Sequence, residues 1–216
     1  MERHAGLSPR TLGILNRVRV LVTGFEPFAG LPHNPSQAVL ERLPALKGIE
    51  LVRATLPVDT QRVGGVLKEL YRLHQPALAL HLGLAMGRAL ISLERLAVNL
   101  LDFDLPDNAG ARPQEVPILP EGPLARLSRL PLRAIQARWA QAGIPSQISN
   151  SAGLYLCNQV MYLALSWLPE GVPAGFIHLP PDETLALARP GAYVPLAVQA
   201  RAVGLALEVS LESLRP

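Results

Sequence analysis

The segment ALALHLG, residues 77–83, decides the fold class of this chain. It is apolar almost throughout and ends at a glycine, which is typical of a strand buried on both faces of a parallel sheet. Before it, apolar residues recur at helical spacing from Val63 to His74, with Asp59 as the predicted N-cap and Pro76 as the stop. A helix followed by a buried strand is the repeating unit of an α/β domain.

Extended and helical segments alternate along the rest of the chain, so we expect a mostly parallel sheet with helices on both sides. The predicted strands cover residues 17–23, 50–58, 77–83, 146–149 and 174–180, with a further extended segment at 89–101. One further helix is predicted to begin at Pro35 or Ser36, and two others to span residues 131–142 and 196–214. The segment around Cys157 is also predicted to be helical. A proline-rich loop is predicted over residues 102–123.

The length of 216 residues suits one domain, and the sequence contains no internal repeat and no interdomain linker. We assign residues 17–216 to a single α/β domain. Residues 1–16 precede its first strand as an N-terminal extension, either a disordered tail or a misassigned start. Hydrophobic residues make up 49% and charged residues 17%, which is enough apolar material for a large core.

Charge and composition exclude several classes of function. The net charge is +3, but arginines are scattered and no basic run interleaves with aromatic residues, so we expect no nucleic-acid partner. The N-terminus has no signal-peptide core, and no segment approaches the ~18–20 apolar residues of a membrane span. We therefore expect a soluble cytoplasmic protein. A single cysteine excludes an internal disulfide and a multi-cysteine zinc site.

That cysteine, Cys157, lies in SAGLYLCNQVMYL, residues 151–163. Free cysteine is among the most buried residue types, so the segment could simply be a core-facing helix. A nucleophilic thiol would instead need a base, a group that orients the base, and donors for an oxyanion. The choice between these two interpretations depends on what else the fold brings to Cys157.

The carboxyl ends of strands are where open α/β sheets place their sites, and polar residues gather there in this sequence. His178 closes the strand of GFIHLP, whereas His81 lies inside a strand and reads as a core imidazole. Glu94 is a carboxylate within an apolar run; it could orient a histidine, or pair with Arg95 on a solvated edge. From residue types alone, Cys157, His178 and Glu94 form one of several possible catalytic sets.

Four blocks of the sequence resemble pyroglutamyl peptidase type I, also called pyrrolidone carboxyl peptidase, a family of cysteine ω-exopeptidases. They are VLVTGFEPFAGLPHNPS (20–36), HLGLAMGRALISLERLAVNLLDFDLPDNAG (81–110), GIPSQISNSAGLYLCNQVMYL (143–163) and GFIHLP (175–180). The resemblance spans about residues 17–181. It implies a phosphorylase/hydrolase-like α/β fold, no metal or cofactor, and a homo-oligomer, commonly a tetramer.

The resemblance also implies roles for particular residues. Cys157 matches the family's nucleophile, His178 its histidine and Glu94 its glutamate. Arg88 matches an arginine that lines the site near the scissile carbonyl, where it would join the backbone N–H of Cys157 in meeting the oxyanion.

Two phenylalanines, Phe25 and Phe28, match residues that hold the pyroglutamyl ring; without the resemblance, core packing at a loop base would be the simpler interpretation. Asn34 matches a structural asparagine. The chain departs from the family at Ala29, where glycine is usual and a positive φ is expected to be strained, and at Asp104, where many members carry arginine.

The implied activity is hydrolysis of the bond after an N-terminal pyroglutamyl (5-oxoproline) residue of a peptide, through a thioester intermediate. Two alternatives remain open. One is a cysteine amidase or esterase of the same fold with a different substrate. The other is a catalytically silent α/β binding module in which Cys157 only packs.

Overall fold

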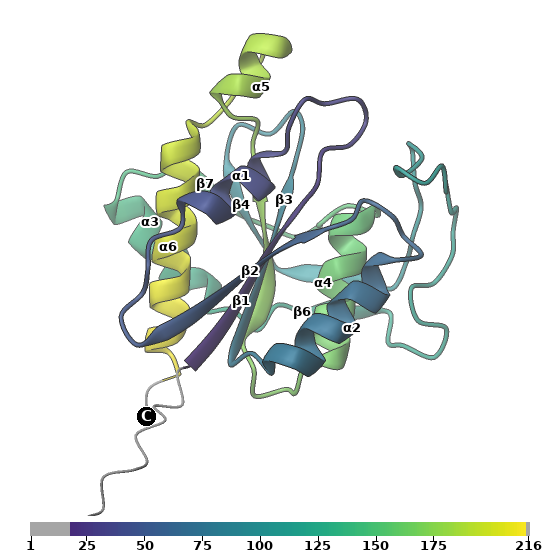
Figure 1. Ribbon diagram of the computed structural model, residues 1–216, viewed down its shortest axis with the longest axis horizontal. Helices are drawn as coiled ribbons and strands as arrows, with labels where there is room; N and C mark the ends of the chain where they lie inside the picture. The colour runs from purple at the N-terminus through teal and green to yellow at the C-terminus, as the bar shows by residue number, and fades with distance from the viewer. Residues whose placement is uncertain (1–17, 215–216) are drawn as a thin grey trace, which may run out of the picture.

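A six-stranded sheet forms the centre of the structure, a computed structural model that describes residues 18–214 (Figure 1). The predicted N-terminal extension, residues 1–16, lies outside the described residues. The strand order is β2-β1-β3-β8-β4-β7. The strands are β1 (Val18–Phe25), β2 (Ile49–Leu56), β3 (Leu78–Leu84), β4 (Ile91–Glu94), β7 (Ser146–Ser149) and β8 (Ala174–Leu179).

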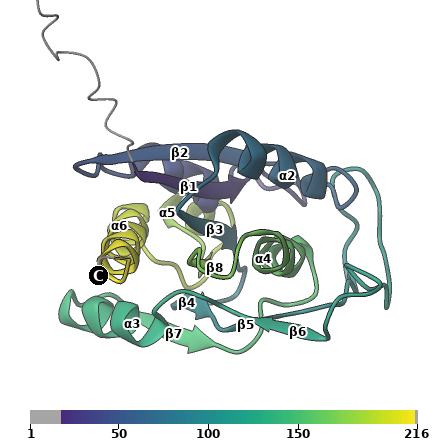
Figure 2. The same cartoon turned by 90° about the horizontal axis from the view of Figure 1, so that it is seen from below.

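Helices cover both faces of this sheet, which confirms the predicted fold class (Figures 1 and 2). One face packs against α1 (Pro35–Arg42), α3 (Leu132–Gln141) and α6 (Leu196–Glu212). The other face packs against α2 (Val63–His74) and α4 (Leu156–Trp167). A short helix, α5 (Glu183–Ala188), follows β8 and extends beyond the layers in Figure 1.

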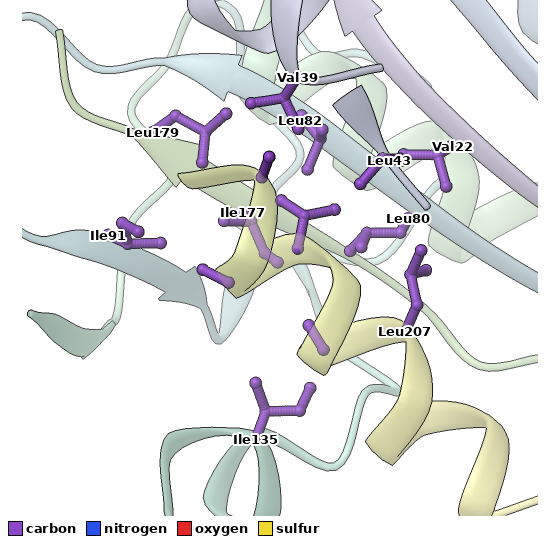
Figure 3. Packing of buried hydrophobic residues seen from close by; sticks show 14 of the residues in the cluster. Val22, Val39, Leu43, Leu80, Leu82, Ile91, Ile135, Ile177, Leu179 and Leu207 are labelled. Carbon is purple, nitrogen blue, oxygen red and sulfur yellow. The ribbon is translucent and has the colours of Figure 1, made fainter. Parts of the chain in front are cut away.

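The predicted central strand, β3, is buried along its whole length. Its leucines at 78, 80 and 82 join the cluster under α6, while Ala79 on the alternate side joins the cluster under α4. Figure 3 shows the α6 side, where Leu80, Leu82 and Ile177 pack with side chains of the helices. Burial of each such leucine side chain stabilises the folded state by ~1.5–3 kcal/mol, so packing against helices on both faces stabilises the sheet.

Strand direction reverses once within the sheet. The pairs β1–β2, β1–β3, β3–β8 and β4–β7 are parallel, but β4 runs antiparallel to β8. Gly83 of β3 pairs with His178, and Glu94 at the end of β4 pairs with Phe176, two residues before His178. The reversal therefore places the end of β4 beside the middle of β8, and Glu94 shares a sheet face with Phe176 and His178.

The predicted extended segment 89–101 is divided between two sheets. β4 belongs to the main sheet, while β5 (Leu96–Val98) pairs with β6 (Ala125–Leu127) in a two-stranded ribbon. Arg95 separates them: its N–H donates to Ser149 O of the main sheet, and its carbonyl accepts from Ser128 N beside the ribbon. Apolar residues continue from β4 into β5, so the sequence pattern gave no signal for the boundary between the two strands at Arg95.

The structure shows the outcome for the predicted N-cap, Asp59, and for Ala29. Asp59 is not the N-cap of α2, because it lies four residues before the helix and its carboxylate accepts from the backbone N–H groups of Gln61 and Arg62. It caps the turn that leads into the helix. Ala29 adopts a positive φ, 51°, which is the condition under which the departure from glycine was expected to cause strain. A residue with a β-carbon is strained at such a φ, because the β-carbon comes too close to the backbone carbonyl oxygen.

Candidate active site

A buried histidine–carboxylate pair lies where the strand direction reverses. The Nδ1 atom of His178 is 2.8 Å from Oε1 of Glu94, and the two residues are 5% and 0% exposed. A carboxylate beside Nδ1 accepts its N–H, and this fixes the tautomer in which Nε2 carries the free lone pair. The contact therefore fixes the His178 ring with Nε2 directed away from Glu94.

The carboxylate of Glu94 is ionised despite its burial. Desolvation acts to raise its pKa, but the hydrogen bond and charge of His178, with smaller contributions from the neighbouring Ser149 hydroxyl and from Arg88, outweigh that effect and lower the pKa overall. The Arg88 Nη1 atom donates to the same oxygen, Oε1, at 2.7 Å. Glu94 is thus a fixed negative charge that can stabilise a protonated His178.

Arg88 connects Glu94 on β4 with the turn that precedes α4. Its Nη2 atom donates to the carbonyl of Ser151 at 3.2 Å, in the turn that precedes α4, while Nη1 holds Glu94. Its side chain remains 29% exposed, and its positive charge acts to lower the pKa of Cys157. The structure therefore places Arg88 against Glu94 and the turn, with part of the guanidinium open to solvent.

Cys157 is the second residue of α4, and its thiol lies over the β3–β8 pair. A β-carbon added to Gly83 would lie 2.7 Å from the Cys157 sulfur and 2.8 Å from Cζ of Phe176. Gly83 is the ladder partner of His178, and partners on parallel strands direct their side chains to the same face. The thiol and the imidazole therefore occupy the same face of the sheet.

The surroundings of Cys157 favour the protonated form of its thiol. Burial raises its pKa to about 12, the charge of Glu94 adds to that rise, and Arg88 and the residue's own backbone N–H oppose it. Within residues 18–214 the thiol makes no hydrogen bond to His178. Catalytic contacts of this kind often tighten only when substrate binds. Reaction through Cys157 would then require removal of its proton by a base.

An apolar cavity opens beside the thiol. Its lining residues come from the ends of β1, β2 and β3, from the loop between β1 and α1, and from the start of α4; they are Phe25, Phe28, Asn34, Val58, Leu84, Tyr155, Leu156 and Cys157. Both predicted phenylalanines therefore line a cavity together with the predicted nucleophile. Phe25 is also part of the buried cluster under α4, so it packs as well as lining the cavity.

Sequence reasoning missed Tyr155, which completes the aromatic wall of this cavity. Its ring lies 6.1 Å from that of Phe28 and 4.4 Å from that of Phe103, between centroids, and its hydroxyl donates to Pro106 O. Tyr155 stands only two residues before Cys157, and that proximity was the one available signal. The contact with Phe103 depends on a loop some fifty residues earlier in the chain, which no local pattern shows.

The loop that carries Phe28 is held by buried polar contacts. Asn34 caps α1 by accepting from Ser36 N at 3.1 Å and donates to the carbonyl of Glu26 at 3.0 Å. His33 Nε2 lies 2.9 Å from Oδ1 of Asp182, just after β8. This second contact links the Phe28 loop to the segment that follows the strand of His178.

In the described part of the chain, no group of three or more histidine, cysteine, aspartate or glutamate side chains is placed to hold a metal ion. None of the helices between residues 18 and 214 is long and apolar enough to cross a membrane.

The fold and the site together define a class, the α/β cysteine hydrolases: a thiol at a helix N-terminus faces a histidine–glutamate pair across one face of a mostly parallel sheet. Comparison with known proteins identifies the family within this class. A model of the pyroglutamyl peptidase family matches residues 18–213, and the chain belongs to that family of cysteine peptidases.

Individual relatives agree with this assignment. The chain is 45% identical to a pyrrolidone-carboxylate peptidase of Deinococcus radiodurans, covering 88% of this chain and 92% of the relative, and 41% identical to that of Pyrococcus furiosus, covering 91% and 100%. A crystal structure of pyrrolidone carboxyl peptidase from Thermus thermophilus superposes with a TM-score of 0.86 at 59% identity, covering 88% and 99%. The resemblance read from the sequence blocks is confirmed.

Proposed function

We propose that this chain removes N-terminal pyroglutamyl residues from peptides by cysteine-peptidase chemistry, with Cys157 as nucleophile, His178 as base and Glu94 as the group that orients the base. The observation that carries the proposal is the apolar cavity that opens directly on Cys157. Membership of the pyroglutamyl peptidase family and the names of the relatives support it.

The chemistry of the cavity suits a lactam. A pyroglutamyl residue has a flat five-membered ring and no charged α-amine, so its recognition needs apolar walls and a few hydrogen bonds instead of a carboxylate. The residues that line the cavity include neither an acidic nor a basic side chain. Phe25 and Phe28 are proposed to hold the ring, with Tyr155 beside them, and each aromatic contact adds ~0.5–1.5 kcal/mol beyond buried area.

The reaction divides into two acyl transfers. His178 Nε2 takes the thiol proton, the sulfur of Cys157 attacks the pyroglutamyl carbonyl, and the backbone N–H of Cys157 meets the oxyanion. The C–N bond then breaks, and the leaving amine takes the proton from His178. Water, deprotonated by the same imidazole, attacks the thioester, which releases pyroglutamate and restores the thiol.

Arg88 is proposed to line the site beside the scissile carbonyl and to assist the oxyanion. Two features support this role: part of its guanidinium is exposed, and its positive charge acts to lower the pKa of Cys157. Both the thiolate and the oxyanion are negative, so one cation favours both. Its contacts with Glu94 and the Ser151 carbonyl hold it at that position.

A pyroglutamyl-aminomethylcoumarin assay of the wild type and Cys157→Ala tests the nucleophile. We expect release of the fluorophore by the wild type and a loss of at least about 10³-fold in the variant, because no other side chain supplies the acyl acceptor. Circular dichroism checks that Cys157→Ala folds. Appreciable turnover by a folded Cys157→Ala would contradict the assignment.

A substrate panel separates the alternatives. Prolyl and glutaminyl reporters resemble pyroglutamyl in size but carry a charged amine, and preferential cleavage of either would favour a different amidase. Phe28→Ala should raise KM about tenfold with a smaller change in kcat, because it removes ring contacts formed in the ground state. A wild-type thiol that resists iodoacetamide and shows no protection by 2-pyrrolidone would favour a silent binding module.

The partners and surroundings of the enzyme are part of the same proposal. We propose that it acts in the cytoplasm on N-terminally pyroglutamylated peptides, as a homo-oligomer, most simply the tetramer that the family resemblance implies, and without metal, cofactor, nucleic acid or membrane. Light scattering at micromolar concentration tests the oligomeric state. Full activity after dialysis against EDTA tests independence from metal.

A further inference from the structure

Ser149 lies beside the buried carboxylate of Glu94 without taking part in the proposed chemistry. It is the last residue of β7 and the ladder partner of Glu94, the last residue of β4. Partners on neighbouring parallel strands direct their side chains to the same face of the sheet. The Ser149 hydroxyl therefore emerges on the face where Glu94 meets His178.

The two oxygens of Glu94 are unequally satisfied. Oε1 accepts from Arg88 Nη1 at 2.7 Å and lies 2.8 Å from His178 Nδ1. Oε2 is buried and has no hydrogen-bond partner among the described residues. A buried carboxylate oxygen without a donor is costly, and such atoms in folded proteins generally have a partner available.

The Ser149 hydroxyl is the donor within reach. It donates to the Ser151 carbonyl at 3.1 Å, yet it also interacts with Glu94 and contributes to the low pKa of that carboxyl. A serine hydroxyl can exchange acceptors by rotation about its Cα–Cβ and Cβ–Oγ bonds. The Ser151 carbonyl keeps a donor after the exchange, because it also accepts from Arg88 Nη2 at 3.2 Å. The Ser151 N–H, which donates to Ser149 Oγ at 3.3 Å, is at an exposed position where water can replace that acceptor.

We propose that Ser149 is a positioning residue for Glu94: its hydroxyl moves from the Ser151 carbonyl to Oε2 of Glu94 and donates there while His178 carries the proton of Cys157. This inference rests on the proposed function. A carboxylate held at only one oxygen can rotate about its terminal C–C bond, whereas donors at both oxygens fix its plane. Oε1 then stays directed at the imidazolium.

Ser149→Ala is the first test, with the pyroglutamyl reporter as readout. We expect kcat/KM to fall about tenfold, mainly through kcat, because the contact forms only after proton transfer. Ser149→Thr keeps the hydroxyl and should restore most of the activity. Ser146→Ala, at the other end of the same strand, is the matched control and should stay within twofold of the wild type.

A double-mutant cycle distinguishes action through Glu94 from a role in the turn. In a Glu94→Gln background, Ser149→Ala should cause no further loss, because an amide at position 94 has already replaced the carboxylate that the hydroxyl serves. A second tenfold loss in that background would show that Ser149 acts only through the Ser151 turn and would overturn the inference.

The same measurements separate failure of this inference from failure of the proposed function. A wild type that does not cleave the reporter contradicts the function itself. An active wild type whose Ser149→Ala variant keeps full activity contradicts only the positioning role.

Discussion

Two buried histidines, His81 and His178, lie on neighbouring strands and differ in almost everything except residue type. His81 is inside β3 and pairs in the ladder with Phe176, two residues before His178 on β8. Its Nδ1 lies 2.7 Å from the Thr23 hydroxyl and its Nε2 lies 3.0 Å from the Tyr71 hydroxyl. Both ring nitrogens are thereby occupied by neutral partners.

Those neutral partners leave His81 nothing to stabilise a charge. Burial lowers its pKa to about 3, so the ring is neutral at any ordinary pH and works as a polar bridge between β1, β3 and α2. His178 has a carboxylate on Nδ1, and its Nε2 makes no hydrogen bond to any residue of 18–214. The two histidines therefore differ in their partners: His81 has a neutral group on each nitrogen, whereas His178 has an anion on one nitrogen and leaves the other open for the proposed role as base.

The largest expected effect comes from removing the free nitrogen. His178→Ala should lower kcat/KM by about 10⁴-fold while the protein stays folded, because the thiol proton then has no acceptor. Reporter kinetics together with thermal unfolding measure both quantities. If His178→Ala kept activity within tenfold of the wild type, the proposed role of His178 as the base would be contradicted, and it would differ from His81 only in its hydrogen-bond partners.

Acid should act on the fold through His81. The ring titrates near 6.5 in the unfolded chain and at about 3 in the folded one, so its contribution to stability is complete above pH 6.5 and is lost as the pH falls toward 3. The loss from this one group amounts to at most about 5 kcal/mol. Urea unfolding between pH 3 and 7 measures it.

An NMR titration of the ring protons is the direct check on that prediction. The His81 resonances should not move between pH 8 and 4.5, whatever the other histidines do. A midpoint near 6 would mean that the ring can charge inside the fold, and the expected acid sensitivity would need another cause.

Gly83 offers a way to displace Cys157 or Phe176 by a change on the strand that carries His81. A β-carbon there would lie 2.7 Å from the Cys157 sulfur and 2.8 Å from Phe176 Cζ, so Gly83→Ala must displace one or both. We expect kcat/KM to fall about 100-fold and the free energy of unfolding to fall by about 1–3 kcal/mol. Gly65→Ala, on α2 in open space, is the matched control: it should leave kcat/KM unchanged and raise the free energy of unfolding by about 0.5–1 kcal/mol, because alanine favours the helix more than glycine does.

The smallest expected effect isolates the structural histidine. Tyr71→Phe deletes only the hydroxyl near His81 Nε2 and should reduce the free energy of unfolding by about 1–3 kcal/mol, because a buried nitrogen loses its partner. Activity at a temperature where the variant is folded should stay within twofold. A drop in kcat with unchanged stability would instead connect His81 to the reaction.

Much of the fold could be predicted from the sequence. The apolar pattern of β3, the helical spacing of α2 and the short strand β7 were expected within a few residues of their positions, because periodicity reports local structure directly. β6 and α5 were not expected. They have three and six residues, too few for a period to show, and β6 exists only because it pairs with β5.

The candidate site could be predicted only in part. Cys157, His178 and Glu94 were proposed largely from the family resemblance, and the structure brings Glu94 and His178 within hydrogen-bond distance. Their distance along the chain, 84 residues, carries no local signal. The contacts of Arg88 with Ser151 and of His33 with Asp182 were missed for the same reason, since each joins loops from distant parts of the sequence.

By itself, the sequence determined the fold class and the family, and it predicted the residues proposed to carry the chemistry, because composition, periodicity and short motifs are properties of neighbouring residues. The tertiary structure alone decided the hydrogen-bond partners of the two buried histidines. The reversal of direction between β8 and β4 places Glu94 against His178, while parallel packing closes Thr23 and Tyr71 around His81. Strand direction and register depend on long-range pairing and packing, which no local pattern encodes.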